Sequence, residues 1–290
     1  MYSDLSIVIT NYKTPKILQK SLSLLEKYAV GAKLIVVDSD SQDGSVELVQ
    51  KHFKQVKIIE VANHSMGNAA NAGMKLATTP YIMQMNADVY ISKNTINDLL
   101  NVLKQDNVGM VAPRAKNPSG KWQNQGIPYR RFHFLLDFGR KQSIKAAWLH
   151  GCCLMIKSEL DNIAMFDTNF RFYNEDIDLS YRVIRAGYEC RMVNTEVLHL
   201  GGSSTPNNAN FIVEGYRGGY ILSQKYKSNL FALLHRQYVL LEANIQLLSA
   251  SGEKAKAYSI IKKMFLKQDF GESPFGKTLN DSNPNFKYFK

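Results

Sequence analysis

Short apolar runs alternate with segments of helical period through the first half of the chain, and this alternation restricts the fold more than any other feature. Apolar runs at residues 5–10, 33–37, 56–61, 80–85 and 108–112 predict strands. Helices are expected from Pro15 onward and at residues 45–53, 68–77 and 92–103. Such alternation predicts a mainly parallel α/β sheet flanked by helices. The strands should end along one edge, where open α/β sheets bind their ligands.

The second half of the chain changes character twice. Residues 116–145 are rich in Gly, Pro, Asn, Gln, Arg and aromatic residues, which predicts a long surface loop, and an apolar strand is expected at 146–156. Helices are expected at 210–226, 229–248 and 253–266, followed by a loosely ordered tail at 270–290. We therefore predict an α/β domain over residues 1–205 and a C-terminal helical extension and tail over residues 206–290.

Composition limits the class of protein. The chain has 290 residues, of which 45% are hydrophobic, so it can bury a large core. No apolar run reaches the roughly 18 residues of a membrane span, and Asp4 interrupts the only N-terminal stretch that would serve as a signal peptide. Cys152, Cys153 and Cys190 lack metal-ligand spacing, which favours buried free thiols in a reducing compartment. We predict a cytoplasmic protein.

The formal net charge of +11 predicts a polyanionic partner, either nucleic acid, an anionic membrane surface or a phosphorylated substrate. Lysines alternate with apolar residues between positions 254 and 267, which predicts a basic amphipathic helix. Such a helix either contacts an anionic membrane or presents an ordinary solvated face. Because no nucleic-acid-binding module appears, we expect no nucleic-acid partner. A solvated face is the commoner meaning of such a pattern, and the basic helix only slightly favours peripheral contact with a membrane.

The strand at residues 80–85 leads directly into Asn86-Ala87-Asp88. A carboxylate at the carboxyl end of a parallel strand can hold a divalent cation and, through it, a diphosphate. Asp is also common at helix N-caps, so Asp88 could instead cap the helix expected at 92–103. The residues alone leave both interpretations open.

Two other strands are followed by polar residues. After the second strand come Asp38, Asp40 and Asp43. An acid at the position of Asp38 meets the nucleoside in nucleotide-binding α/β sheets, whereas Asp43 lies where the next helix starts and is expected to cap it. The first strand is followed by residues 10–14, which lack a glycine-rich phosphate loop. This absence argues against a dinucleotide-binding Rossmann domain and a P-loop NTPase.

Candidate proton-transfer and metal-binding groups occur later in the chain. Glu175 and Asp176 follow a run of aromatic residues that would partly desolvate a carboxylate and raise its proton affinity, as a general base requires. His199 follows a short strand and precedes a glycine-rich loop. A lone histidine is more often structural than a ligand. Together with Asp88, however, a neutral imidazole suits Mn²⁺ or a similar cation.

These motifs, in this order, resemble the family 2 glycosyltransferases, and particularly their bacterial rhamnosyltransferase-like branch. The resemblance runs from about residue 5 to residue 204. It rests on residues 6–12, 36–45, 67–73, 85–88 and 174–176 and on His199. The resemblance implies a glycosyltransferase-A fold, an inverting reaction and a nucleoside-diphosphate sugar donor.

The resemblance also implies roles for individual residues. The metal-binding motif falls on Asn86-Ala87-Asp88, the catalytic base on Asp176 and the second metal ligand on His199, with Mn²⁺ or Mg²⁺ as the metal. The nucleotide-sugar contacts fall on Thr10, Asn11, Tyr12, Asp38, Asp40, Asn71, Asn86, Ala87 and Asp88. Asn86 replaces the first Asp of the usual motif, so one carboxylate must bind the metal directly. The segment 67–73 that carries Asn71 is shorter than its commonest form.

The predicted reaction begins when Asp176 deprotonates an acceptor hydroxyl, which attacks the anomeric carbon. Glu175 is expected to orient or contact the acceptor, and His150 and Gly151 to line its pocket. Trp148 is expected either there or in the core. The implied acceptor is lipid-linked or a glycan in bacterial surface polysaccharide synthesis, and the first choice of donor is dTDP-rhamnose. A UDP-hexose or UDP-N-acetylhexosamine is the alternative donor.

Two rival functions remain. A nucleotidyltransferase that makes activated sugars should carry a glycine- and arginine-rich loop after the first strand, and residues 10–15 do not form one. A non-catalytic nucleotide-sugar-binding assembly subunit is the rival from another class. The presence of Asp88, Asp176 and His199 argues against that rival.

Overall fold

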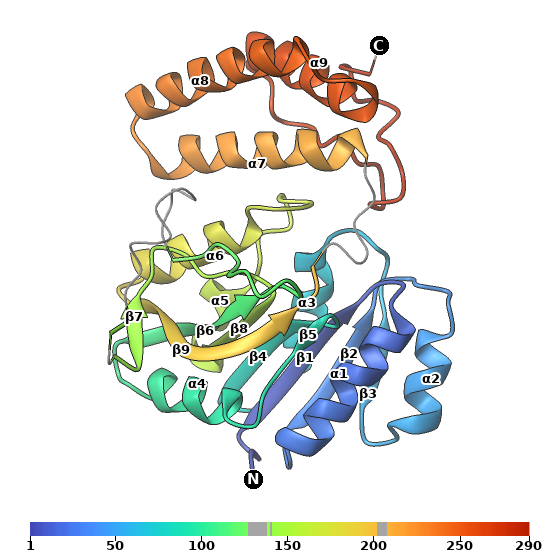
Figure 1. The fold of residues 1–290 in the computed structure, drawn as a ribbon, viewed down its shortest axis with the longest axis vertical. Helices are drawn as coiled ribbons and strands as arrows, with labels where there is room; N and C mark the ends of the chain where they lie inside the picture. The colour runs from blue at the N-terminus through green and yellow to red at the C-terminus, as the bar shows by residue number, and fades with distance from the viewer. Residues whose placement is uncertain (127–137, 140, 202–207, 290) are drawn as a thin grey trace. The chain divides into compact units, whose positions relative to one another are not determined.

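The structure is a computed structural model that describes residues 1–126, 138–139, 141–201 and 208–289 (Figure 1). The chain divides into two compact units. The N-terminal unit comprises Met1–Ala62, Gly67–Asp167 and Asp176–Ser204, and the C-terminal unit comprises Asn63–Met66, Thr168–Glu175 and Thr205–Lys290. The domain boundary predicted at 205–206 lies outside the described residues.

The N-terminal unit is built on a sheet of nine strands with the order β3-β2-β1-β4-β8-β6-β9-β5, and β7 pairs with β9. The strands are β1 (Leu5–Asn11), β2 (Lys33–Asp38), β3 (Lys57–Glu60), β4 (Tyr81–Asn86), β5 (Val89–Tyr90), β6 (Val108–Lys116), β7 (Ser143–Lys145), β8 (Cys153–Lys157) and β9 (Glu189–His199). The first four form the parallel sheet that the sequence pattern predicts. Antiparallel pairings of β8 with β4 and β6, and of β9 with β5 and β7, make the whole sheet mixed.

Helices cover both faces of this sheet. The helices α1 (Pro15–Tyr28), α2 (Ser45–His52) and α4 (Thr95–Leu103) pack their apolar side chains into one core with alternate residues of β1, β2 and β4. The helix α3 (Met66–Met74) packs on the other face, where Gly73 allows close approach. A Cβ at Gly73 would lie 2.3 Å from Cγ1 of Val8 and 2.7 Å from Cγ2 of Val37, so any larger residue would clash. Two further helices are α5 (Asp161–Ala164) and α6 (Glu175–Arg185).

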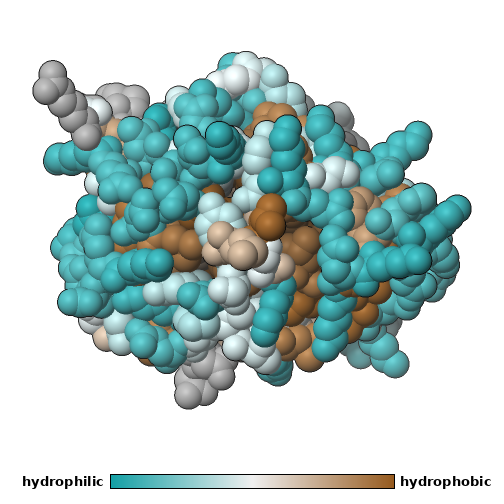
Figure 2. Space-filling view, turned by 90° about the horizontal axis from the view of Figure 1, so that it is seen from below, coloured by the Kyte–Doolittle hydropathy of each residue, from teal (hydrophilic) through white to brown (hydrophobic). Residues whose placement is uncertain are grey.

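The register of the parallel strands brings polar residues together at their carboxyl ends. Thr10 is opposite Asn86, and Asn11 is opposite Asp38. The predicted common edge is thus confirmed for β1, β2 and β4. At the opposite edge, which Figure 2 views, hydrophilic side chains alternate with hydrophobic patches. A hollow of about 310 Å³ lies at that opposite edge and is lined by Met1, Tyr2, Asp4, Leu5, Tyr81, Asn97, Leu100, Asn101 and Lys104.

The prediction of a strand at residues 146–156 is wrong for the first half of that range. Only Cys153–Lys157 forms a strand, β8. In the preceding turn, Leu149–Cys152, side chains accept the backbone N–H groups that a strand would give to its neighbour. Of the loop predicted at 116–145, residues 127–137 and 140 lie outside the described residues, and its end forms β7.

The C-terminal unit contains three helices, α7 (Ala209–Tyr226), α8 (Asn229–Leu247) and α9 (Gly252–Lys267), close to the predicted bounds. The expectation of a loosely ordered tail is wrong. Phe270, Phe286 and Tyr288 are buried in one cluster with the apolar faces of these helices, because the tail supplies aromatic side chains that the small helical core can bury. Among the described helices, none is long and apolar enough to cross a membrane.

A buried charge pair also ties the tail to α7. The guanidinium of Arg217 donates to the Glu214 carboxylate at 2.7 Å and to the carbonyl oxygen of Phe270 at 2.9 Å. Ser273 donates to the other carboxylate oxygen of Glu214 at 2.8 Å. Both charged side chains are almost fully buried, so these bonds replace the hydration that each charge loses on folding.

Candidate active site

Asp88 and His199 come together at the junction of β5 and β9. The antiparallel pairing of these strands places Val89 opposite His199, and Nε2 of His199 lies 3.4 Å from Oδ1 of Asp88. The other carboxylate oxygen of Asp88 accepts the backbone N–H of Gly201 at 3.0 Å. The helix-cap interpretation of Asp88 is therefore wrong, because β5 separates it from α4 and its carboxylate bonds to the segment after β9.

Gln123 fixes the orientation of His199. Its Oε1 lies 2.6 Å from Nδ1 of His199, and its Nε2 donates to the backbone oxygen of His199 at 3.4 Å. Because the amide oxygen can only accept, Nδ1 is the donor in this contact, and the ring is turned so that Nε2 faces Asp88. No motif or period points to Gln123, which lies in the aperiodic segment after β6.

The pair fits a divalent cation. A carboxylate oxygen and an imidazole nitrogen face one another, and both side chains are mostly buried but retain some exposure, 14% for Asp88 and 9% for His199. Imidazole nitrogen and carboxylate oxygen together suit Mn²⁺ and similar cations. Asp88 and His199 are therefore the residues that would hold such an ion.

Asp176 lies in the first turn of α6 with its carboxylate held by two backbone groups. Oδ2 accepts the N–H of Gly151 at 2.9 Å, and Oδ1 accepts the N–H of Ile177 at 2.9 Å. Each oxygen keeps a further lone pair that can accept a proton from a substrate hydroxyl. The preceding residue, Glu175, is the first residue of α6, and its side chain is buried.

The turn Leu149–Cys152 connects Asp176 to the rest of this site. Ser180 accepts the N–H of Leu149 at 3.0 Å and donates to the carbonyl oxygen of Asp176 at 2.8 Å. Gln125 accepts the N–H of His150 at 3.1 Å. The backbone oxygen of Cys152 accepts the N–H of Asn86 at 2.9 Å, so the turn is also tied to the end of β4.

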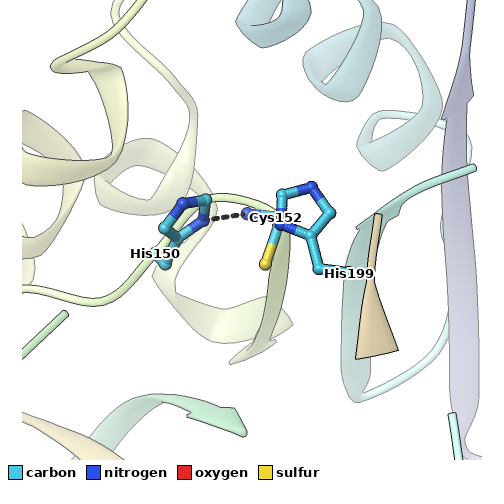
Figure 3. Close-up of side chains that lie close together, drawn as sticks. All are labelled: His150, Cys152 and His199. Atoms are coloured by element: carbon cyan, nitrogen blue, oxygen red, sulfur yellow. Dashed lines mark hydrogen bonds between the residues drawn. The ribbon is translucent and has the colours of Figure 1, made fainter. Parts of the chain in front are cut away.

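His150, Cys152 and His199 present their side chains to one another in Figure 3. Their ligand atoms lie within 4.8 Å, a spacing that would suggest a metal site. Two observations argue against a preformed site. Nδ1 of His150 already accepts the N–H of Cys152 at 3.0 Å, and burial raises the pKa of the Cys152 thiol well above its ordinary value. The thiol therefore stays protonated and is a poor ligand.

The pKa of His150 depends on the charged groups of the site. Burial lowers its pKa, and so does His199, whereas Asp176 and Asp88 raise it. The rings of His150 and His199 pack edge to face with centroids 5.5 Å apart. His150 thus lies within electrostatic range of both acidic residues and is held in the neutral form mainly by burial.

Residues at the ends of β1 and β2 form a hydrogen-bonded network. Asn11 donates to Asp38 at 2.7 Å, and Ser41 donates to Asp38 from both its N–H and its hydroxyl, at 2.8 and 2.7 Å. Asp38 is completely buried, so in the structure its carboxylate braces the loop after β2. Nucleoside contact by Asp38 stays a prediction. Asp40, two residues on, is exposed and accepts from Gln42 at 2.8 Å.

Several other residues predicted to contact the donor form hydrogen bonds within the protein. Thr10 donates to Asn86 at 3.3 Å, and the N–H of Ala87 donates to the Thr10 carbonyl at 2.9 Å. Asn71 bonds both backbone groups of Phe166 at 2.8 Å. Trp148 is buried, in agreement with the core alternative, and Tyr12 is partly exposed. The three cysteines are buried and free, as predicted.

Comparison with known proteins identifies the family. A model of Glycosyl transferase family 2 matches residues 6–163, which is more than half of the chain. The chain belongs to this family. It is a family 2 glycosyltransferase, and the predicted glycosyltransferase-A fold, with a mixed α/β sheet and a C-terminal helical region, is confirmed.

Two curated relatives and one solved structure show the range of similar proteins. The low-salt glycan biosynthesis hexosyltransferase Agl10 of Haloferax volcanii is 28% identical over 67% of this chain and 67% of its own length. The N-acetylglucosaminyl-diphospho-decaprenol L-rhamnosyltransferase of Mycobacterium tuberculosis is 24% identical over 76% of this chain and 84% of its own. The mannosyltransferase PcManGT of Pyrobaculum calidifontis, solved with GDP-Man and Mn²⁺, superposes with a TM-score of 0.59 at 14% identity, covering 92% of this chain and 85% of its own.

Proposed function

We propose that this family 2 glycosyltransferase moves a sugar, with inversion, from a nucleoside-diphosphate sugar to a hydroxyl of a lipid-linked or glycan acceptor. The observation that carries the proposal is the convergence of Asp88 and His199, with Nε2 and Oδ1 at 3.4 Å, in the same unit as the braced carboxylate of Asp176. One acidic group beside an imidazole and a second acidic group held by backbone N–H groups are the components that donor binding and base catalysis require.

Asp176 is the proposed base. A carboxylate oxygen of Asp176 takes the proton from the acceptor hydroxyl while the hydroxyl oxygen forms a bond to the anomeric carbon. The bond from that carbon to the diphosphate oxygen breaks, and the nucleoside diphosphate leaves with the electron pair. The N–H groups of Gly151 and Ile177 hold the carboxylate in one orientation through the step.

Asp88 and His199 are proposed to hold Mn²⁺ or Mg²⁺. When bound, the ion supplies positive charge beside the diphosphate that departs. Gln123 orients the His199 ring with Nε2 toward Asp88, and Gly201 holds the second carboxylate oxygen of Asp88, so both side chains are oriented before any ligand arrives.

Rhamnose from dTDP-rhamnose remains the first choice of donor, because a relative over most of the chain is named a rhamnosyltransferase. A UDP-hexose or UDP-N-acetylhexosamine is the alternative. The name of the same relative also supports a lipid-linked acceptor, which would place the enzyme at the inner face of the cell membrane. Glu175, His150 and Gly151 are proposed acceptor contacts, and Thr10, Asn11, Tyr12, Asp40 and Asn86 are proposed donor contacts.

The test is a donor panel of dTDP-rhamnose, UDP-glucose, UDP-N-acetylglucosamine and GDP-mannose, each with Mn²⁺, with Mg²⁺ or with EDTA. Nucleotide release and thermal shift are the readouts. Asp176→Asn should keep the donor-induced thermal shift and lose nucleotide release, whereas Asp88→Asn should lose both. Asp43→Asn is the matched control, because Asp43 accepts the N–H of Ser45 at the start of α2.

The result that overturns the proposal is a folded wild-type protein that responds to no nucleotide sugar. A donor-induced shift without nucleotide release in any acceptor mixture would instead favour a non-catalytic nucleotide-sugar-binding subunit. Equal nucleotide release by wild type and Asp176→Asn would remove Asp176 from the role of base.

A further inference from the structure

The outward face of α8 in the C-terminal unit is uncharged and largely apolar. Seven large hydrophobic side chains on α8 and its C-cap are between 48% and 87% exposed: Leu230, Leu233, Leu234, Tyr238, Leu241, Ile245 and Leu248. Among the described residues of α8 itself, the other exposed positions are Asn229, Gln237 and Asn244. Soluble proteins seldom leave such a continuous apolar strip uncovered without a function for it.

The histidine, arginine and glutamate side chains of α8 all lie toward its neighbouring helices. His235 lies 2.6 Å from the Ser223 hydroxyl on α7, and Arg236 donates to the carbonyl oxygen of Phe265 on α9 at 2.9 Å. Burial, followed by Tyr258 and Glu242, raises the pKa of Tyr216 on α7, so Glu242 lies near that helix. The exposed positions of α8 therefore lie on one arc of the helix, and the helix packs on α7 and α9 with the opposite arc.

The adjacent helix supplies positive charge. α9 carries five lysines against one acid, Glu253, and Glu253 accepts the N–H of Ala209 at 2.9 Å. Lys254, Lys256, Lys263 and Lys267 are exposed. Because α8 and α9 pack against each other, and packed helices lie about 8–10 Å apart, α9 adds net positive charge next to α8.

We propose that the apolar face of α8, with the lysines of α9 beside it, docks the enzyme on an anionic lipid bilayer. The hydrophobic side chains would enter the headgroup region while the lysines pair with lipid phosphates, which is the arrangement of interfacial amphipathic helices. The proposal is consistent with the membrane-associated acceptor proposed above, but it needs neither donor nor acceptor.

A second copy of the chain fits this face less well. A helix of 19 residues is about 28 Å long and about 10 Å wide, so its face covers roughly 300 Å². A stable protein interface buries about 800 Å² on each partner. Protein interfaces also carry a polar rim, whereas the lysines of α9 would repel the same lysines of a second copy.

Vesicle co-sedimentation with the full chain, without nucleotide sugar, tests the proposal. Vesicles of phosphatidylcholine alone are compared with vesicles containing about one third phosphatidylglycerol. The double variant Leu234→Gln/Leu241→Gln removes apolar area from exposed positions and should weaken binding by roughly tenfold or more. Lys256→Gln/Lys263→Gln should abolish most of the preference for the anionic vesicles.

The matched control is Val30→Gln/Leu76→Gln, which changes two exposed apolar residues of the N-terminal unit and should bind like wild type. Three results overturn the proposal: wild type that binds no vesicle, α8 variants that bind as wild type does, and a wild-type dimer in sedimentation velocity that Leu234→Gln/Leu241→Gln dissociates without any vesicle binding. Failure of the donor panel alongside normal vesicle binding would refute the proposed function and leave this surface intact.

Discussion

Oε1 of Gln123 lies 2.6 Å from Nδ1 of His199, although the two residues are 76 positions apart. The contact fixes the orientation of the His199 ring. It therefore decides that Nε2 is the ring nitrogen that faces Asp88. A side chain outside every recognisable motif thus sets the chemistry of the candidate metal-binding pair.

Replacing Gln123 with Leu should weaken Mn²⁺ binding by about 10- to 100-fold, because Nδ1 loses its acceptor and the ring loses its fixed orientation. Gln123→Glu keeps an acceptor oxygen at this place and should bind Mn²⁺ much closer to wild type. Electron paramagnetic resonance titration of Mn²⁺ measures this effect without any substrate. Equal affinity of Gln123→Leu and wild type would contradict the orienting role of Gln123.

Gly73→Ala should destabilise the N-terminal unit by about 1–3 kcal/mol, because its Cβ would overlap Val8 and Val37 in a packed layer. Gly219→Ala in α7 is the matched control, since the nearest atom to its Cβ, Oδ1 of Asn174, is 3.8 Å away. This control should be neutral or should stabilise the helix by up to about 1 kcal/mol. Urea unfolding monitored by circular dichroism gives both values. A neutral Gly73→Ala would mean that α3 moves freely on the sheet.

Glu214→Gln should destabilise the C-terminal unit by about 3–5 kcal/mol, because the substitution leaves Arg217 charged and buried without its partner. Glu196→Gln removes an acid from a solvent-accessible pair with Lys116 and should cost at most about 1 kcal/mol. Thermal unfolding of the two variants provides the comparison. Similar losses in both would show that burial contributes little to the Glu214–Arg217 pair.

Acid should destabilise the C-terminal unit in part through His235. Burial lowers the pKa of His235 below its ordinary value of 6.5, so the unfolded chain binds this proton more readily than the folded chain. The associated stability is present above about pH 6.5 and is lost as the pH falls through the lower folded pKa. His235→Gln should flatten the pH dependence of the unfolding free energy between neutral and mildly acidic pH. His64 and His150, whose pKa values are also lowered, contribute equally to both proteins and cancel in the difference.

Much of the fold follows from local sequence pattern. The apolar runs predicted β1 to β4 and β6, and apolar residues at helical spacing predicted α1 to α4 and α7 to α9. Both patterns arise because strands and helices bury apolar side chains in the core. The structure of the tail could not be predicted from local sequence pattern. Phe270 and Phe286 sit in a segment without period, and their burial depends on a core that only three packed helices create.

The sequence by itself determined that Thr10, Asp38 and Asp88 follow strands of one parallel sheet, since alternation of strands and helices leaves the carboxyl ends on one edge. The tertiary structure alone decided how the acids are used. Asp38 is sealed inside a network with Asn11 and Ser41, while Asp88 meets His199 through the pairing of β5 with β9. That distinction depends on hydrogen bonds between residues far apart in the chain, and such bonds leave no period or spacing in the sequence.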